Sequence, residues 1–164
     1  MKFVSIIMSS KTDHPIMSEC ADTFKKFGVP YELIISSAHR SPERTKAYIE
    51  EAEAKGAQVF VAASGMSAHL AGALAATTTK PVLGVPMEKG PLNGEDALLS
   101  TVMMPAGMPV GTVAIGKAGA VNAAYLAIQI MALDDDELKV KLQEDRISKA
   151  KKVELDSSTV EVRL

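Results

Sequence analysis

The sequence predicts an α/β protein, a three-layer sandwich in which helices cover both faces of a central parallel sheet. Short apolar runs alternate along the chain with longer segments of helical spacing, which is the pattern of βαβ units and a right-handed parallel sheet. The short runs are almost continuously apolar, as strands covered on both faces are. A flavodoxin-like or Rossmann-like sheet with an additional C-terminal helix satisfies both observations.

Five segments have the composition of buried strands. Each is short, consists mostly of apolar residues, and lies between segments of different periodicity. The predicted strands are Phe3–Met8, Tyr31–Ile35, Gln58–Ala63, Pro81–Val85 and Gly111–Ile115. Together they would supply the central sheet.

Helices are predicted where the apolar spacing lengthens. Pro15–Phe27 follows Asp13, a potential N-cap, and stops at Gly28. The other predicted helices are Pro42–Lys55, Ala68–Thr77, Ala118–Leu133 and Asp134–Lys152. The Ala-rich segment Ala118–Leu133 is apolar on more than one face, so we expect it to be buried all round, under the sheet or against another subunit.

The chain of 164 residues is predicted to form a single catalytic domain spanning residues 1–164. Residues 134–164 would form a charged helix followed by a polar tail. The apolar side chains Leu138, Leu142 and Ile147 of this helix need a surface to cover them. We therefore expect the helix and tail to pack on a neighbouring subunit.

The composition excludes several classes of function. Eighteen Lys and Arg against twenty Asp and Glu leave a net charge of −2, which argues against nucleic-acid binding. Cys20 is the single cysteine, so an internal disulfide or a multi-cysteine zinc site is excluded, and burial is expected for it. The first apolar run, Phe3–Met8, is too short to cross a membrane, and a cytoplasmic location is expected. No spacing of ligands predicts a metal, and no GxGxxG predicts a dinucleotide cofactor.

Polar residues follow the first predicted strand, at the sheet edge where parallel sheets bind ligands. Ser10 and Thr12 offer hydroxyls beside backbone N–H groups at a helix N-terminus, which favours an anion such as phosphate. Asp13 would then be free to bind ribose hydroxyls. A plain helix cap is the alternative interpretation of these residues.

The loops after the second and third strands add groups that can transfer a proton and bind an anion. His39 exchanges a proton near neutral pH, and the Arg40 guanidinium matches a phosphate or carboxylate. Ser37 precedes them, while Gly65 and His69 follow the third strand. A solvated Arg, a surface His and a core His are the purely structural alternatives.

These loops predict an enzyme that acts on a phosphorylated small molecule by proton transfer, with His39 as the acid and base. A flavin-binding electron-transfer module has the same fold class and is the alternative of another kind. The loops at this edge carry no aromatic residue that could stack on a flavin ring.

A set of motifs resembles one known family. MSSKTD, SAHRSPE, SGMSAHLAG, PVLGVPM, LNGEDALLS and MPAGMPVGTVAIGKAGAVNAAYLA occur in this order between about Val4 and Leu133. They are similar to the motifs of the catalytic subunit family of phosphoribosylaminoimidazole carboxylase. The match is closest to its mutase branch, the 5-(carboxyamino)imidazole ribonucleotide mutases.

The resemblance implies conversion of 5-(carboxyamino)imidazole ribonucleotide to 4-carboxy-5-aminoimidazole ribonucleotide in purine (IMP) biosynthesis, without metal or cofactor. It implies decarboxylation and recarboxylation, with His39 as general acid and base. Ser10 and Asp13 match the family's nucleotide ligands, and Arg40 matches its phosphate contact. The pocket-wall residues are matched by Ser37, Gly65 and His69. The family forms octamers around its Ala-rich helices, so a homo-octamer is expected.

Arg40 after His39 resembles the mutase branch, whereas the related branch that carboxylates aminoimidazole ribonucleotide with free carbon dioxide usually has Lys there. Some positions depart from the family. Gly is usual where Ser9, Ala63 and Met66 stand, Pro where Ala71 stands and Gln where Met103 stands. A bulky side chain at Met66, in place of a residue free to adopt positive φ, is expected to reshape the pocket.

Overall fold

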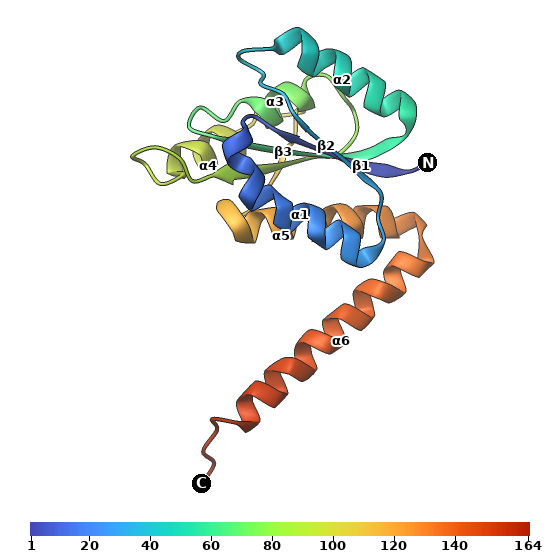
Figure 1. The fold of residues 1–164 in the computed structure, drawn as a ribbon, viewed down its shortest axis with the longest axis vertical. Helices are drawn as coiled ribbons and strands as arrows, with labels where there is room; N and C mark the ends of the chain where they lie inside the picture. The colour runs from blue at the N-terminus through green and yellow to red at the C-terminus, as the bar shows by residue number, and fades with distance from the viewer. The chain divides into compact units, whose positions relative to one another are not determined.

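The computed structural model describes residues 1–164, which divide into two compact units, Met1–Ile128 and Gln129–Leu164. The first unit contains one sheet of five parallel strands in the order β2-β1-β3-β4-β5 (Figure 1). The strands are β1 (Phe3–Met8), β2 (Tyr31–Ile35), β3 (Ala57–Gly65), β4 (Val82–Met87) and β5 (Gly111–Thr112). Every neighbouring pair is parallel, so the predicted α/β fold class is confirmed.

Helices cover both faces of this sheet. The helices are α1 (His14–Phe27), α2 (Pro42–Lys55), α3 (Leu70–Ala75), α4 (Glu95–Val102) and α5 (Gly116–Met131), with a 3-10 turn η1 at Lys11–Asp13. Helices α1 and α5 lie on one face, and α2 and α3 lie on the other (Figure 1). The rings of Phe27 in α1 and Tyr125 in α5 meet edge to face at 5.4 Å. This arrangement is the predicted three-layer sandwich.

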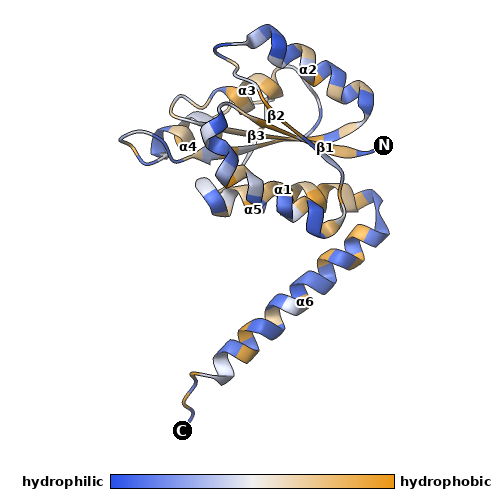
Figure 2. Cartoon of the chain, viewed as in Figure 1, coloured by the Kyte–Doolittle hydropathy of each residue, from blue (hydrophilic) through white to orange (hydrophobic).

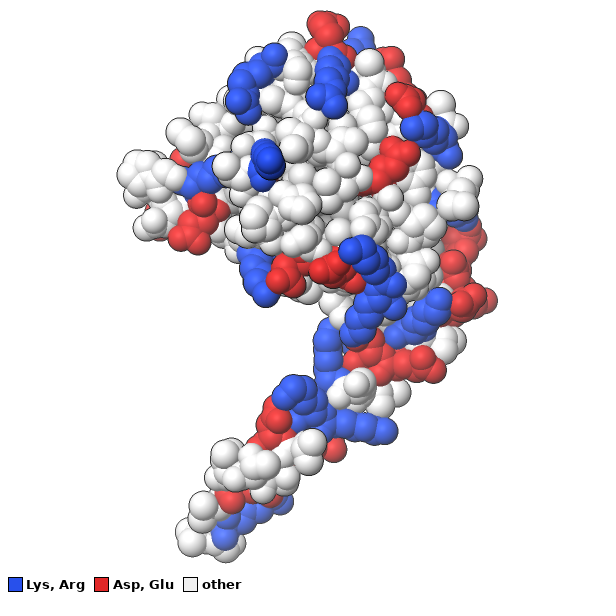
Figure 3. All heavy atoms as spheres, in the orientation of Figure 1, with Lys and Arg blue, Asp and Glu red and all other residues white.

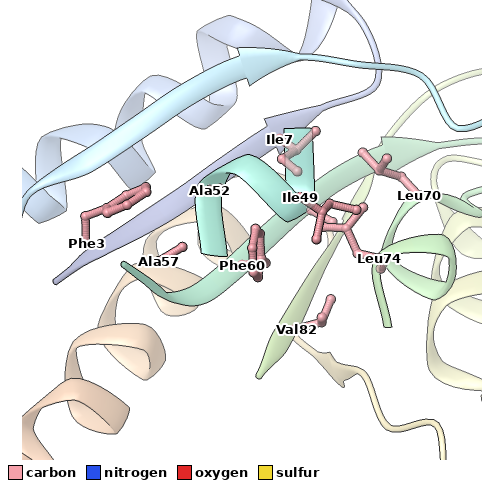
Figure 4. Packing of buried hydrophobic residues seen from close by; sticks show 11 residues of the cluster. Phe3, Ile7, Ile49, Ala52, Ala57, Phe60, Leu70, Leu74 and Val82 are labelled. Carbon is pink, nitrogen blue, oxygen red and sulfur yellow. The ribbon is translucent and has the colours of Figure 1, made fainter. Parts of the chain in front are cut away.

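One buried apolar cluster lies between the strands and the α2–α3 layer, and the other face of the sheet buries side chains of α1 and α5 such as Phe24 and Ile128. Figure 4 shows Phe60 of β3 packed among Ile49 of α2, Leu74 of α3 and other apolar side chains, all of them buried. The strands are the most hydrophobic part of the chain (Figure 2). Burial of one large apolar side chain contributes about 1.5–3 kcal/mol, so this cluster fixes the helices against the sheet.

Helix boundaries follow the local signals closely. Helix α1 has Pro15 in its first turn and ends at Gly28, which has φ +71°. The predicted N-cap is wrong in one respect, because the Asp13 side chain makes no capping hydrogen bond to α1. Cys20 of the same helix is fully buried, and burial raises the pKa of its thiol to about 12. The thiol is therefore a packing group, as expected.

Several elements differ from the prediction. Strand β5 has only two residues, because just Gly111 and Thr112 pair with β4. Helix α4 was not predicted; it begins after Gly94 with two acidic residues in its first turn. Helix α5 buries a stripe that includes Ala120, Ala124 and Ile128, but Ala118 and Asn122 are exposed. The single chain therefore buries one face of α5, and coverage of its other side by another subunit stays a prediction.

The second unit consists of the end of α5, the 3-10 turn η2 (Ala132–Asp134) and helix α6 (Asp136–Ser158). Asp135 caps α6 by accepting a hydrogen bond from the backbone N of Leu138 at 3.0 Å. The helix continues to Ser158, so part of the predicted polar tail is helical. Acidic and basic side chains are both present along α6 (Figure 3). No helix of the chain combines the length and the hydropathy that a membrane crossing requires.

Candidate active site

A cavity of about 430 Å³ opens at the carboxyl edge of the sheet. The loops after β1, β2 and β3 line it, and Lys89 after β4 completes the wall. Strand order places β1 beside β3, and their outgoing helices α1 and α3 lie on opposite faces (Figure 1). Ligands of open parallel sheets bind where two neighbouring strands send their helices to opposite faces of the sheet. The strand order therefore creates this site.

Two histidines meet in the cavity. His39 Nε2 lies 2.6 Å from His69 Nδ1, and the rings stand nearly perpendicular at 81°. A hydrogen bond between two ring nitrogens requires that one carries the proton and the other offers a lone pair. His39 comes from the loop after β2 and His69 from the loop after β3, so packing of both loops fixes this proton-sharing pair.

Hydrogen bonds hold the second loop against the first. The Arg40 guanidinium donates through Nη2 to the Ser9 carbonyl at 3.1 Å, and the Arg40 backbone N donates to Ser37 Oγ at 3.2 Å. Ser41 Oγ accepts from the Ser37 backbone N at 3.2 Å, which closes the turn. Arg40 is exposed to the cavity, so its remaining N–H donors can bind an anionic group.

The first loop forms the turn η1. Ser10 caps it by accepting from the Thr12 backbone N at 3.3 Å, and the two hydroxyls lie 3.0 Å apart. Ser10 lines the cavity, but Thr12 does not. Ser10 is therefore a cap that also lines the cavity. Its role as a nucleotide ligand stays a prediction.

Asp13 forms a buried ion pair. Its side chain is fully shielded from solvent, with Lys89 Nζ 2.5 Å from Oδ1 and Ser9 Oγ donating to Oδ2 at 3.2 Å. Asp13 does not line the cavity, whereas Lys89 does. In this structure the carboxylate contacts Lys89 and Ser9 behind the cavity wall, and its binding of ribose hydroxyls stays a prediction.

The third loop has an unusual backbone. Met66 adopts φ +56°, in the left-handed region, and its side chain is 55% exposed at the cavity. This conformation costs about 1–3 kcal/mol for a residue other than glycine. Gly65 is required by packing, because a Cβ there would lie 2.8 Å from Cδ of Lys89. Met66 therefore places a strained, exposed side chain at the cavity. The change of pocket shape expected from the sequence would arise at this side chain.

The structure brings most of the predicted site residues together. The cavity is lined by Ser10, Ser37, His39, Arg40, Gly65 and His69. The exposed Thr12 and the buried Asp13 do not line it. Sequence reasoning missed Lys89 as a lining residue, although its position directly after a strand at the same edge was a usable signal.

The model of a family described as AIR carboxylase matches residues 3–152. This chain belongs to that family. The match spans every residue of the cavity, from Ser9 to Lys89, so the site lies wholly within the part shared with the AIR carboxylase family. The resemblance inferred from the sequence motifs is confirmed.

Relatives in the AIR carboxylase family are similar over nearly their whole length. A Brucella melitensis protein named N5-carboxyaminoimidazole ribonucleotide mutase is 48% identical over 150 residues, which cover 92% of this chain and 93% of that protein. An Escherichia coli K12 protein of the same name is 49% identical over 143 residues, covering 87% and 85%. The crystal structure of Treponema denticola PurE superposes with a TM-score of 0.89 at 27% identity, covering 99% and 100%.

Proposed function

We propose that this protein is an isomerase that converts 5-(carboxyamino)imidazole ribonucleotide to 4-carboxy-5-aminoimidazole ribonucleotide in purine biosynthesis. The observation that carries this proposal is the His39–His69 pair, 2.6 Å apart, in one cavity with Arg40. Relatives at 47–49% identity named as mutases support the choice of substrate. A volume of about 430 Å³ suits a mononucleotide.

Carboxylate transfer needs a group that gives one proton and takes one back. In the first step the bond between the exocyclic nitrogen and the carboxyl carbon breaks, carbon dioxide forms, and the nitrogen receives a proton from His39. In the second step ring carbon 4 attacks carbon dioxide, and His39 removes the proton from that carbon. The two steps balance, so no other proton donor is required. The hydrogen bond between the His39 and His69 rings holds the His39 ring in place during both transfers.

Binding energy far from the reacting carbon can orient the imidazole. We assign the phosphate to Arg40 and Ser10, because both line the cavity and Arg40 is tied to the first loop. Ser37 and Gly65 form the walls between the loops. Contacts to the non-reacting phosphate then position the ring for attack on carbon dioxide.

An assay of the purified protein with two nucleotides tests the proposal. Turnover of 5-(carboxyamino)imidazole ribonucleotide without added bicarbonate is the expected result. Turnover only of 5-aminoimidazole ribonucleotide with bicarbonate would instead assign the branch that uses free carbon dioxide. Inactivity toward both, with tight flavin binding, would favour an electron-transfer module.

Replacement of Arg40 by Ala should weaken nucleotide binding by about 1.5–3 kcal/mol, the usual value for a hydrogen bond to a charged group. The dissociation constant of 5-aminoimidazole ribonucleotide, measured by calorimetry, should rise by roughly ten- to a hundred-fold. Arg44→Ala is the matched control, because Arg44 is exposed in the first turn of α2 and does not line the cavity. An unchanged constant in Arg40→Ala would remove Arg40 from phosphate binding.

We further propose that residues 1–164 act as one catalytic domain of a cytoplasmic homo-octamer, with residues 134–164 packed on a neighbouring subunit. Helix α6 exposes apolar side chains, among them Val140, Ile147 and Val153 at 50–68%. Such side chains are normally covered when they recur along one helix. Light scattering should give about eight times the monomer mass. A stable monomer at micromolar concentration would overturn this assignment.

A further inference from the structure

Lys89 lines the cavity, and its ammonium group has more N–H donors than its ion pair with Asp13 uses. Its side chain is 25% exposed, and Asp13 Oδ1, 2.5 Å from Nζ, is the protein acceptor that it contacts. An ammonium group has three N–H donors, so two are left for another partner. Asp13 is fully buried, and apart from this ion pair its Oδ1 accepts no hydrogen bond. The fixed partner of the pair is therefore the carboxylate, and the partner open to a ligand is the ammonium.

The surrounding loops hold Lys89 in this position. The contact of Gly65 with the Lys89 stem leaves no room for a Cβ at residue 65. Ser9 Oγ donates to the other oxygen of Asp13 and so fixes the rotation of that carboxylate. Lys89 is thus anchored at its stem and at its charge, which lowers the entropy it loses when it binds a ligand.

Two cations reach the cavity from different strands of the sheet. Arg40 follows β2 and crosses to the Ser9 carbonyl, whereas Lys89 follows β4 and crosses to Asp13. The nucleotide of the proposed function carries two separate anionic groups, its phosphate and the carboxylate that migrates. One cation for each anion gives complementary charge across the ligand.

We infer that Lys89 is a substrate-binding residue that recognises the migrating carboxylate of the nucleotide, and that Asp13 is its positioning residue. This inference rests on the proposed function. In the assigned arrangement Arg40 takes the phosphate, the histidine pair handles the proton, and Lys89 distinguishes a carboxylated from a non-carboxylated imidazole. Since the assignment concerns one group of the ligand, two nucleotides that differ only in that group can test it.

The experiment compares the binding of two nucleotides to Lys89→Met by calorimetry. Met keeps the length of the apolar stem and removes the charge. We expect binding of 4-carboxy-5-aminoimidazole ribonucleotide to weaken by about ten-fold or more, the loss of one charge-assisted hydrogen bond. Binding of 5-aminoimidazole ribonucleotide, which lacks the carboxylate, should change by less than about two-fold, since the phosphate contacts remain. Lys89→Arg should recover a part of the lost affinity.

Lys80→Met is the matched control, because Lys80 lies just before β4, at the opposite edge of the sheet. It changes the net charge equally and should leave both affinities unchanged. If Lys89→Met does not fold because Asp13 is left buried without its cation, the double variant Asp13→Asn with Lys89→Met removes that charge as well. The same comparison of the two nucleotides then applies.

Equal weakening of both nucleotides, or no weakening of either, would overturn the assignment of Lys89. These outcomes differ from a failure of the proposed function. In that case the unaltered protein itself would neither bind the two nucleotides nor turn over 5-(carboxyamino)imidazole ribonucleotide. An unaltered protein that is active, with a Lys89→Met variant that does not discriminate, would overturn the inference alone.

Discussion

Replacement of His39 by Asn should lower turnover of 5-(carboxyamino)imidazole ribonucleotide by roughly two to four orders of magnitude, the usual contribution of general acid–base catalysis. The Asn side chain can still form hydrogen bonds in the cavity, but it cannot donate and recover a proton at neutral pH. The loss should appear in kcat, measured by the steady-state rate. The affinity for 5-aminoimidazole ribonucleotide should stay close to that of the unaltered protein.

His14→Asn provides the control for this variant. His14 is the remaining histidine, is exposed at the start of α1, and does not line the cavity. It should keep the full rate. If His39→Asn turned over substrate as fast as His14→Asn, His39 would have no part in the reaction and the mechanism would be wrong.

The largest effect on stability is expected for Phe60→Ala, which should lower the free energy of unfolding by about 3–5 kcal/mol. Phe60 is fully buried in β3, at the centre of the cluster with Ile49 and Leu74. Its removal leaves a cavity that the sheet and the two helices cannot close completely. Urea unfolding followed by circular dichroism gives the difference, provided that the slope with denaturant is unchanged.

Leu99→Ala is the control for this variant, because Leu99 is 63% exposed on α4. Its effect should stay within about 0.5 kcal/mol. A loss below about 1 kcal/mol for Phe60→Ala would mean that the core between the sheet and helices α2 and α3 is far more loosely packed than the structure indicates.

Elements with strong local signals could be predicted closely from the sequence. The bounds of Phe3–Met8, Tyr31–Ile35 and Pro42–Lys55 agree with the structure, because apolar runs end in polar residues and helices are delimited by Pro and Gly. Gly111–Ile115 was predicted too long, since pairing at a sheet edge depends on the partner strand and not on composition. Glu95–Val102 was missed because eight residues carry too little periodicity.

The loops of the candidate site could be predicted, but not the pairs within them. Parallel topology brings every strand's carboxyl end to one edge, so His39 and His69 were expected near each other. Their hydrogen bond and the Asp13–Lys89 ion pair depend on side-chain packing between distant segments, which no local pattern encodes. Asp13 was interpreted as a helix cap and as a ribose ligand, and its ion pair with Lys89 was not predicted because Lys89 lies after β4.

The short distance between Gly65 and the Lys89 stem makes the choice of side chain at position 65 depend on the side chain at position 89. A sequence that gains any side chain at 65 displaces the methylene groups of Lys89, and with them the charge that neutralises Asp13. A substitution at Gly65 is therefore expected to disturb the Asp13–Lys89 ion pair as well. Attempts to redesign the selectivity of this pocket should vary these positions jointly, beginning with the glycine.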